Sequence, residues 1–148
     1  MVTAARVASG DSDGREHFRV ELPTDLSQVG VVVEAVVSCC QTVASVSTRT
    51  EFRLCTMVAE AVANAMVNGN RNDPARRVTV DIEFEHDRII IAVSDEGEGF
   101  DPAAVPDPTH DAVLDSTRGR GLFMIRSLAD HVAFNDRGNT IWMTLTRC

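Results

Sequence analysis

The chain of 148 residues is long enough for one domain with a buried core, and its hydrophobic fraction of 44% and charged fraction of 24% are those of a soluble globular protein. Its formal net charge of -8 argues against a direct nucleic-acid binder or an anionic-membrane binder, because phosphate groups would be repelled overall. All 14 basic residues are arginine, which excludes chemistry that needs a lysine amine, such as a Schiff base.

Residues 1–15 are small, polar and glycine-containing, and they predict a mobile tail ahead of a single domain over residues 16–148. No stretch is apolar enough for a signal peptide or a membrane span, so we expect a cytoplasmic protein. The chain has four cysteines: Cys39, Cys40, Cys55 and Cys148. Their spacing is unlike that of a zinc site and predicts reduced, small hydrophobic residues.

The first regular elements are a strand and a helix. The stretch H-F-R-V-E-L-P alternates apolar and polar residues, which predicts a half-buried strand that ends at Pro23. Thr24 or Asp25 can cap the helix that follows, and its apolar spacing continues to about Ala44.

A second helix and a hairpin come next. Ser47 or Thr48 can cap this helix, which we expect to run to about Val67 and to end at Asn68-Gly69-Asn70. The alternating runs R-V-T-V-D-I-E-F-E and R-I-I-I-A-V-S-D then predict two strands joined by a turn at His86-Asp87.

The last third of the chain begins with residues 100–118, which lack periodicity; a loop of this length is usually functional or mobile. Residues 121–130 predict a short amphipathic helix, and H-V-A-F-N with T-I-W-M-T-L-T predicts a final hairpin around Asp136-Arg137-Gly138-Asn139. The order of elements predicts an α+β, two-layer sandwich, with a mainly antiparallel sheet covered on one face by three helices.

Three polar residues recur every four positions on the second helix: Glu60, Asn64 and Asn68. They therefore share one helical face. One interpretation is a solvated polar stripe. The other is a hard-cation site, in which an amide oxygen contributes to a Mg²⁺ shell and Glu60 orients or deprotonates a hydroxyl group.

The stretch D-E-G-E-G-F follows a bulky strand and places Asp95 where that strand ends. Its carboxylate can accept a hydrogen bond from an exocyclic amine, and Gly97 and Gly99 would let the backbone lie close to a flat ring. An ordinary glycine turn is the alternative. We expect Glu96 and Glu98 to be solvated.

The stretch R-G-R-G-L contains Gly119 and Gly121 just before the predicted third helix. Backbone N–H groups at a helix start can bind phosphate, and Arg118 and Arg120 could add charge-assisted bonds. A G-x-G ahead of a helix is common, so this motif indicates little by itself.

The order E-x-x-x-N, D-x-G-x-G-F, long loop and G-x-G-L resembles the GHKL superfamily of histidine kinase-like ATPases, which have the Bergerat ATP-binding fold. The match extends from Glu60 to Thr146, and the preceding strand and helices also fit. The form E-A-V-x-N-A and the ending from Gly119 onward are most similar to the anti-sigma-factor serine/threonine-protein kinase family.

This resemblance implies ATP and Mg²⁺ as cofactors, with Glu60 as the catalytic base and Asn64 as the metal ligand. It implies that Asp95 reads the adenine amino group, that Thr140 supports Asp95, and that residues 101–118 form an ATP lid. The other cofactor-binding residues that it implies are Asn68, Gly97, Gly99, Phe100, Arg118, Gly119, Arg120, Gly121 and Leu122.

The resemblance also implies a function in bacterial partner switching. The protein would phosphorylate a serine of a small STAS-type antagonist, sequester a sigma factor, and form a homodimer through its first strand and helix. Relatives often have histidine at the position of Asn68, and an amide cannot titrate near neutrality, which puts the kinase rate in doubt. The alternative is a non-catalytic nucleotide-binding module that regulates by partner binding alone.

Overall fold

The computed structural model describes residues 3–7, 16–43, 46–99 and 117–147. Its strands are β1 (Thr3–Val7), β2 (Glu16–Pro23), β3 (Arg77–Phe84), β4 (Arg88–Asp95), β5 (His131–Phe134) and β6 (Thr140–Thr146). Its helical segments are the 3₁₀ turn η1 (Leu26–Gln28), α1 (Val29–Thr42), α2 (Thr48–Asn64), the π-helical turn η2 (Ala65–Gly69) and α4 (Thr117–Leu128).

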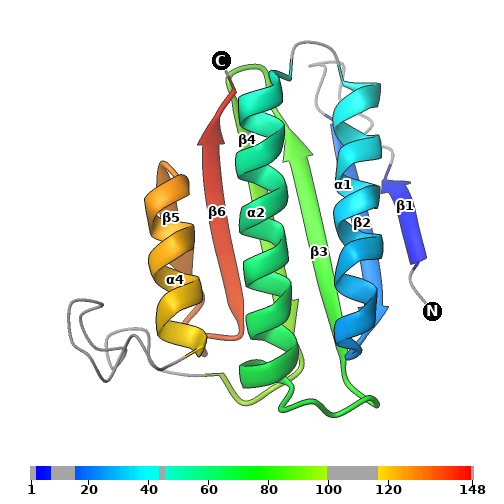
Figure 1. Ribbon diagram of the computed structural model, residues 1–148, viewed down its shortest axis with the longest axis vertical. Helices are drawn as coiled ribbons and strands as arrows, with labels where there is room; N and C mark the ends of the chain where they lie inside the picture. The colour runs from blue at the N-terminus through cyan, green and yellow to red at the C-terminus, as the bar shows by residue number, and fades with distance from the viewer. Residues whose placement is uncertain (1–2, 8–15, 44–45, 100–116, 148) are drawn as a thin grey trace.

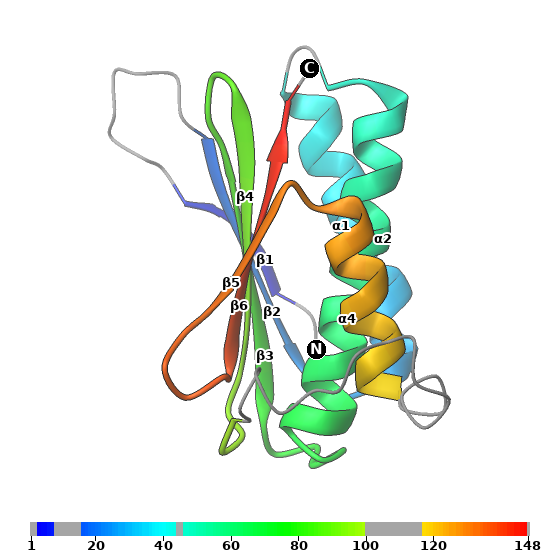
Figure 2. The same ribbon diagram turned by 90° about the vertical axis from the view of Figure 1, so that its left-hand side faces the viewer.

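The strands form one six-stranded antiparallel sheet in the order β1-β2-β3-β4-β6-β5. Figure 1 shows α1, α2 and α4 side by side across this sheet, and Figure 2 shows that all three cover the same face. The predicted α+β two-layer sandwich is therefore confirmed.

One predicted segment is wrong in part. Residues 3–7 belong to the stretch interpreted as a mobile tail, yet they form β1, which pairs with β2 from Thr3 opposite Glu21 to Val7 opposite His17. Backbone N–H and C=O groups make this ladder, so a run of small residues can join the sheet edge without an apolar pattern. The rest of that stretch lies outside the described residues.

The core lies between the sheet and the helices because alternate strand residues face the helical layer. Val80 and Ile82 of β3 and Ile91 of β4 are fully buried, as are Leu54 and Met57 of α2. The residues between them on each strand lie on the open face of the sheet, where Trp142 of β6 is 39% exposed. Strand alternation and helical spacing thus meet at one interface.

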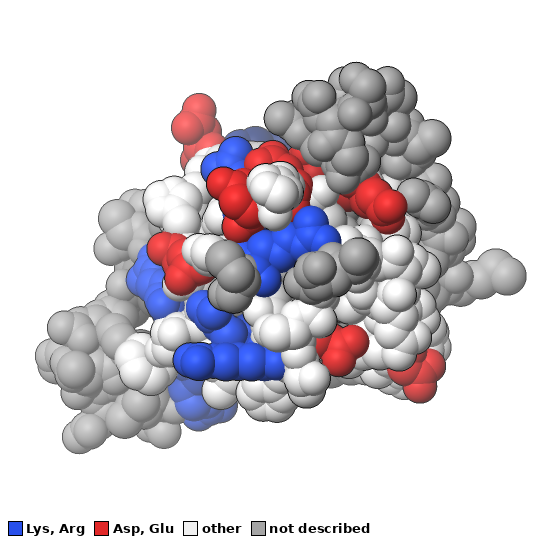
Figure 3. Space-filling model, turned by 90° about the horizontal axis from the view of Figure 1, so that it is seen from above, with Lys and Arg blue, Asp and Glu red and all other residues white. Residues whose placement is uncertain are grey.

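Arginine and acidic side chains lie side by side at the end of the molecule that carries the β3–β4 turn (Figure 3). Arg88 Nε lies 2.7 Å from Glu85 Oε2, and Arg147 Nη1 donates to the Glu85 carbonyl oxygen at 2.7 Å. Arg53 of α2 donates through Nε to the Leu128 carbonyl oxygen at 3.1 Å. This last bond ties the C-terminal end of α4 to α2.

Two of the predicted hydrophobic cysteines, Cys39 and Cys40 of α1, are buried in the core. Burial raises the pKa of the Cys39 thiol to about 11 and, with nearby Cys55 and Glu51, that of Cys40 to about 12. Both thiols therefore stay protonated near neutral pH and pack as small apolar groups. Among the described residues, no helix is both long enough and apolar enough to cross a bilayer.

Capping at Ser47 starts α2, as the sequence predicts. Its Oγ accepts from the Thr50 backbone N–H at 3.1 Å and lies 2.9 Å from Thr50 Oγ1. We expect Ser47→Ala to lower the free energy of unfolding by about 1 kcal/mol, because an N–H of the first turn loses its acceptor. Chemical denaturation followed by circular dichroism measures this change.

The matched control is Ser38→Ala, which replaces an exposed serine within α1. We expect this control to stay within about 0.5 kcal/mol of wild type. Equal midpoints for Ser47→Ala and Ser38→Ala would contradict the capping role.

Candidate functional site

The C-terminal end of α2 carries two of the predicted polar residues. Regular α-helix ends at Asn64, and the π-helical turn that follows closes with the Asn70 N–H donating to the Ala65 carbonyl oxygen at 2.7 Å. Asn68 Nδ2 lies 3.5 Å from Asn64 Oδ1, so the two amides are neighbours as the spacing predicts. Single π-helical turns often occur at functional sites.

A pocket with a volume of about 450 Å³, including space open to solvent, lies beside this helix end. Its lining residues come from α2, η2, β4, the segment after β4, α4 and the β5–β6 hairpin: Ala61, Asn64, Ala65, Gly69, Val93, Asp95, Gly99, Leu122, Ile125, Phe134, Gly138, Asn139 and Ile141. Most are apolar, and the polar groups are few, as in sites for small organic ligands.

Asp95 is the only acidic residue among the pocket-lining residues that the structure describes. Its Oδ1 accepts from the Gly97 backbone N–H at 2.8 Å, and its own N–H donates to the Asn139 carbonyl oxygen at 2.9 Å. The carboxyl group of Asp95 is therefore bonded to the loop that follows β4, and its backbone is bonded to the β5–β6 hairpin. Such a carboxylate can accept a hydrogen bond from a ligand amine.

The glycines around Asp95 are required by close backbone packing. A Cβ at Gly97 would lie 2.0 Å from the Gly69 carbonyl oxygen, and a Cβ at Gly69 would lie 2.3 Å from Asp95 Oδ2. Gly99 has φ +86°, and a Cβ there would lie 1.7 Å from the Arg137 carbonyl oxygen. The end of α2, the loop after β4 and the β5–β6 hairpin thus meet with no room for side chains.

The two glycines near the third helix are placed differently from the prediction. Helix α4 begins at Thr117, so Gly119 and Gly121 lie inside its first turns and are buried, where glycine is intrinsically unfavourable. Packing against α2 explains Gly121: a Cβ there would lie 2.4 Å from Asn64 Nδ2. The close approach of the two helices therefore outweighs helix propensity at this position.

Asn64 has a polar atom that the protein leaves unsatisfied. Within the part of the chain that the structure describes, its Nδ2 is buried and has no hydrogen-bond partner. Burying an amide group without a partner is costly, so a polar ligand in the pocket would remove this penalty. The Oδ1 atom has the weak contact with Asn68 and further capacity to accept or coordinate.

The pocket brings together four of the predicted site residues: Asn64, Asp95, Gly99 and Leu122. Gly97 and Gly121 support it through the packing above. Glu60 is partly buried one helical turn before Asn64, outside the pocket lining. Phe100, the side chain of Arg118 and residues 101–116 of the predicted lid lie outside the described residues.

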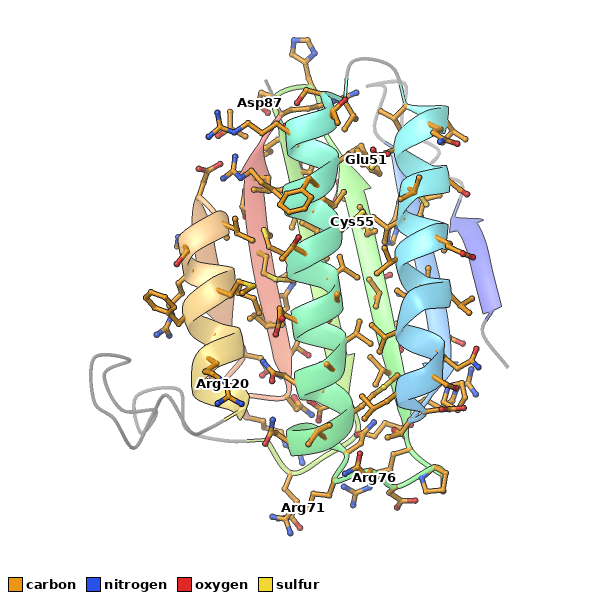
Figure 4. All side chains as sticks on the ribbon, in the orientation of Figure 1. Glu51, Cys55, Arg71, Arg76, Asp87 and Arg120 are labelled. Carbon is orange, nitrogen blue, oxygen red and sulfur yellow. The ribbon has the colours of Figure 1, made fainter. Side chains whose placement is uncertain are left out.

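Three other residues named from the sequence, Thr140, Glu96 and Arg120, lie outside the pocket lining. Thr140 Oγ1 lies 2.9 Å from Ser94 Oγ, next to Asp95 in sequence, and its support of Asp95 itself stays a prediction. Glu96 was expected to be only solvated, but its carboxylate accepts a hydrogen bond from the Arg77 backbone N–H. Arg120 is exposed at the lower end of α4 (Figure 4).

Sequence reasoning missed several lining residues, above all Gly69, Gly138 and Asn139. It assigned Gly69 to the end of a helix and the other two to a hairpin turn, and each assignment is correct. Their second role depends on contacts between distant segments. Gly69, beside two asparagines and without a Cβ, was the one local signal that could have indicated it.

Comparison with known proteins identifies a family and several similar proteins. A family model described as a histidine kinase-like ATPase domain matches residues 22–145. An anti-sigma F factor of Oceanobacillus iheyensis is 32% identical over 95 residues, which cover 60% of this chain and 64% of that protein. A serine-protein kinase RsbW of Staphylococcus epidermidis is 38% identical over 94 residues, 58% of this chain and 59% of that protein.

A serine-protein kinase RsbW of Staphylococcus aureus is similar in the same way, with 35% identity over 95 residues. These residues cover 59% of this chain and 60% of that protein. The match therefore spans less than two thirds of the length of each of these relatives.

Gly99 offers a sharp test of the packing at the pocket. We expect Gly99→Ala to lower the free energy of unfolding by about 2 kcal/mol or more, because it combines a left-handed backbone with a clash against a carbonyl group. Thermal and chemical denaturation measure the loss. Gly30→Ala in α1 is the matched control, since a Cβ there meets nothing within 4 Å.

The control should be neutral or stabilising by about 0.5 kcal/mol, because alanine has the higher helix propensity. If both alanine variants had wild-type stability, the close approach at Gly99 would be refuted.

Proposed function

The chain belongs to the histidine kinase-like ATPase domain family, and from this premise we propose that it is an ATP-dependent protein serine/threonine kinase that also acts as an anti-sigma factor. It would bind ATP with Mg²⁺ and phosphorylate a serine of a small antagonist protein. One observation carries this proposal: Asn64, Asp95, Gly99 and Leu122, all named from sequence motifs, line the same pocket.

The lining of the pocket suits an adenine ring in polarity. Its apolar wall includes Ala61, Val93 and Ile141, and Asp95 is its acidic group. In our proposal the Asp95 carboxylate accepts a hydrogen bond from the exocyclic amine of adenine, and the apolar wall packs on the faces of the ring. The Gly97 N–H bond holds this carboxylate in place.

The donors around Asn64 fit a magnesium ion. Mg²⁺ prefers oxygen ligands, keeps several waters and needs few protein ligands when phosphates complete its shell. The Asn64 amide would hold the ion through Oδ1, whereas its unsatisfied Nδ2 is a hydrogen-bond donor and would take no part in the coordination. Bound ATP would supply the phosphoryl group, and Mg²⁺ would neutralise part of the phosphate charge.

Glu60 is the proposed catalytic base. It lies on the face of α2 that carries Asn64, one turn away, and would accept the proton of the substrate serine hydroxyl. The products would be phosphoserine, ADP and one proton. Asn68 contacts Asn64 where relatives often have histidine, and it would orient the ligand amide without titrating.

The proposed sigma factor partner is suggested by the names of the similar proteins, an anti-sigma F factor and two serine-protein kinases, whereas the antagonist and the homodimer come from the family resemblance of the sequence motifs. We propose a sigma factor as the sequestered partner, a STAS-type antagonist as the phosphorylated one, and a cytoplasmic homodimer as the working form. Because the match spans less than two thirds of those proteins, these partners are proposals that pull-down with and without ATP would test.

A second candidate function is nucleotide-controlled partner binding without phosphate transfer. The observation that favours it is Asn68, whose amide occupies the place next to Asn64 and cannot take up or release a proton near neutrality. Capture of a partner that depends on nucleotide, without phosphorylation, would favour this candidate.

We expect wild-type protein to transfer label from γ-³²P-ATP to a serine of the cognate antagonist, and Glu60→Gln to slow this transfer by about 100-fold or more. Because Glu60 lies outside the pocket lining, ATP affinity of Glu60→Gln should stay close to that of wild type. Glu34→Gln, an exposed acid on α1, is the matched control and should label at the wild-type rate.

Wild-type labelling that persists unchanged in Glu60→Gln would remove Glu60 from the mechanism. Absence of label with wild type, despite ATP binding, would instead favour the non-catalytic candidate.

For Asp95→Asn we expect ATP affinity to fall about tenfold or more. The carboxylate would accept a hydrogen bond from the adenine amine, whereas the asparagine NH₂ is itself a donor and repels that amine. Without nucleotide, the melting temperature should change little, since the amide oxygen can still accept from the Gly97 N–H. Isothermal titration calorimetry measures the affinity. The control is Asp87→Asn, at the opposite end of the molecule (Figure 4); equal affinities for both variants would argue against Asp95 as the adenine contact.

A further inference from the structure

Asn70, directly after the π-helical turn, is a fully buried polar residue with 0% exposure. Its Nδ2 donates to Thr24 Oγ1 at 2.9 Å and to the Arg77 carbonyl oxygen at 3.1 Å. Its Oδ1 accepts from the Glu96 backbone N–H at 2.9 Å. The side chain therefore connects the end of α2 with the start of β3, the end of β2 and the loop after β4.

We propose that Asn70 is a positioning residue that sets Asp95 for recognition of the nucleotide base. This inference rests on the proposed function, in which Asp95 contacts adenine. Asn70 does not line the pocket; it acts through the Glu96 N–H, which belongs to the peptide group immediately after Asp95.

The hydrogen bond from the Glu96 N–H to Asn70 restrains the backbone next to Asp95. Gly69, the residue before Asn70, restrains the Asp95 carboxylate. Gly69 packs so closely on the Asp95 carboxylate and on Gly97 that no Cβ fits. Gly69 at the end of η2 and Asn70 directly after it thus contact the carboxylate of Asp95 and the peptide group that follows it. A residue held in this way keeps the geometry that selectivity between similar ligands requires.

The chemistry of the site requires an amide at position 70. Asparagine donates two hydrogen bonds and accepts others from a single planar group, which matches its partners Thr24, Arg77 and Glu96. Aspartate would lose the donors and bury a charge, and an apolar residue would leave the Glu96 N–H unsatisfied. If Asn70 served only to fill the core, an apolar residue of similar size would do. The bond from the Glu96 N–H requires an acceptor at this position.

The test compares ATP with ITP, which has a carbonyl oxygen where ATP has the exocyclic amine. We expect wild type to prefer ATP by on the order of 100-fold, because the partly buried Asp95 carboxylate in the pocket lining repels that oxygen. In Asn70→Ala the ratio of the two dissociation constants should fall about tenfold, since the loop that holds Asp95 loses its anchor. Isothermal titration calorimetry measures both constants.

The matched control is Thr24→Val, in the same hydrogen-bond network. It removes the acceptor of one Nδ2 bond and leaves the bond from the Glu96 N–H to Asn70 Oδ1 intact. We expect lower thermal stability than wild type and an unchanged ATP-to-ITP ratio. An unchanged ratio in Asn70→Ala, or the same loss of ratio in Thr24→Val, would overturn the positioning role.

A second measurement needs no nucleotide, and its first result comes from the wild-type chain alone. Amide hydrogen exchange followed by NMR should show a protected Glu96 N–H in the wild-type chain, and Asn70→Ala should remove this protection. Fast exchange at Glu96 in wild type would overturn the inference even if the alanine variant does not fold. A wild type that binds ATP and ITP equally, with Glu96 protected, would overturn the proposed adenine contact and leave the anchoring of the loop established.

Discussion

The site depends on the direct contact between η2, the π-helical turn that continues α2, and the end of β4. A Cβ at Gly69 would lie 2.3 Å from Asp95 Oδ2, and a Cβ at Gly97 would lie 2.0 Å from the Gly69 carbonyl oxygen. The backbone of η2 therefore packs directly on the backbone of the loop that follows β4. One added methyl group would push the helix away from the sheet, and the pocket between them would lose its shape.

The surrounding structure keeps α2 in this position. Leu54, Met57 and Val58 are fully buried between α2 and the sheet, so the helix cannot slide without exposing apolar surface. Arg53 bonds the Leu128 carbonyl oxygen at the end of α4, which fixes the distance between the two helices. Near the pocket, Gly121 lets α4 approach the amide of Asn64. The polar groups of the site are thus presented by elements that are packed, not by loops alone.

The sequence predicted the elements well because their signals are local. Strand alternation predicted β3 and β4, and Ser47 predicted the start of α2. Asn64, Asp95 and Gly99 were named from motif spacing and line one pocket. Strand β1 was missed, because its five residues owe their place to the backbone edge of β2. The roles of Gly69 and Asn70 were missed because they depend on contacts with Asp95 and Glu96, which are distant in sequence.

The start of α4 shows the same limit. The sequence predicted a short helix over residues 121–130, with the G-x-G motif of Gly119 and Gly121 at its start. In the structure the helix begins at Thr117, and the contact with Asn64 explains why a glycine is tolerated within it. Local propensity was overruled here by packing between helices.

The open face of the sheet has a consequence for spectroscopy. Trp142 is the single tryptophan of the chain, and it lies on β6 between buried Ile141 and Met143, so its ring is on the face opposite the helices. Ala92 of β4 and Ala133 of β5 are its cross-strand neighbours. Its fluorescence therefore reports directly on any molecule that binds the sheet face opposite the helices. A ligand in the pocket can change this fluorescence only by changing the sheet between them.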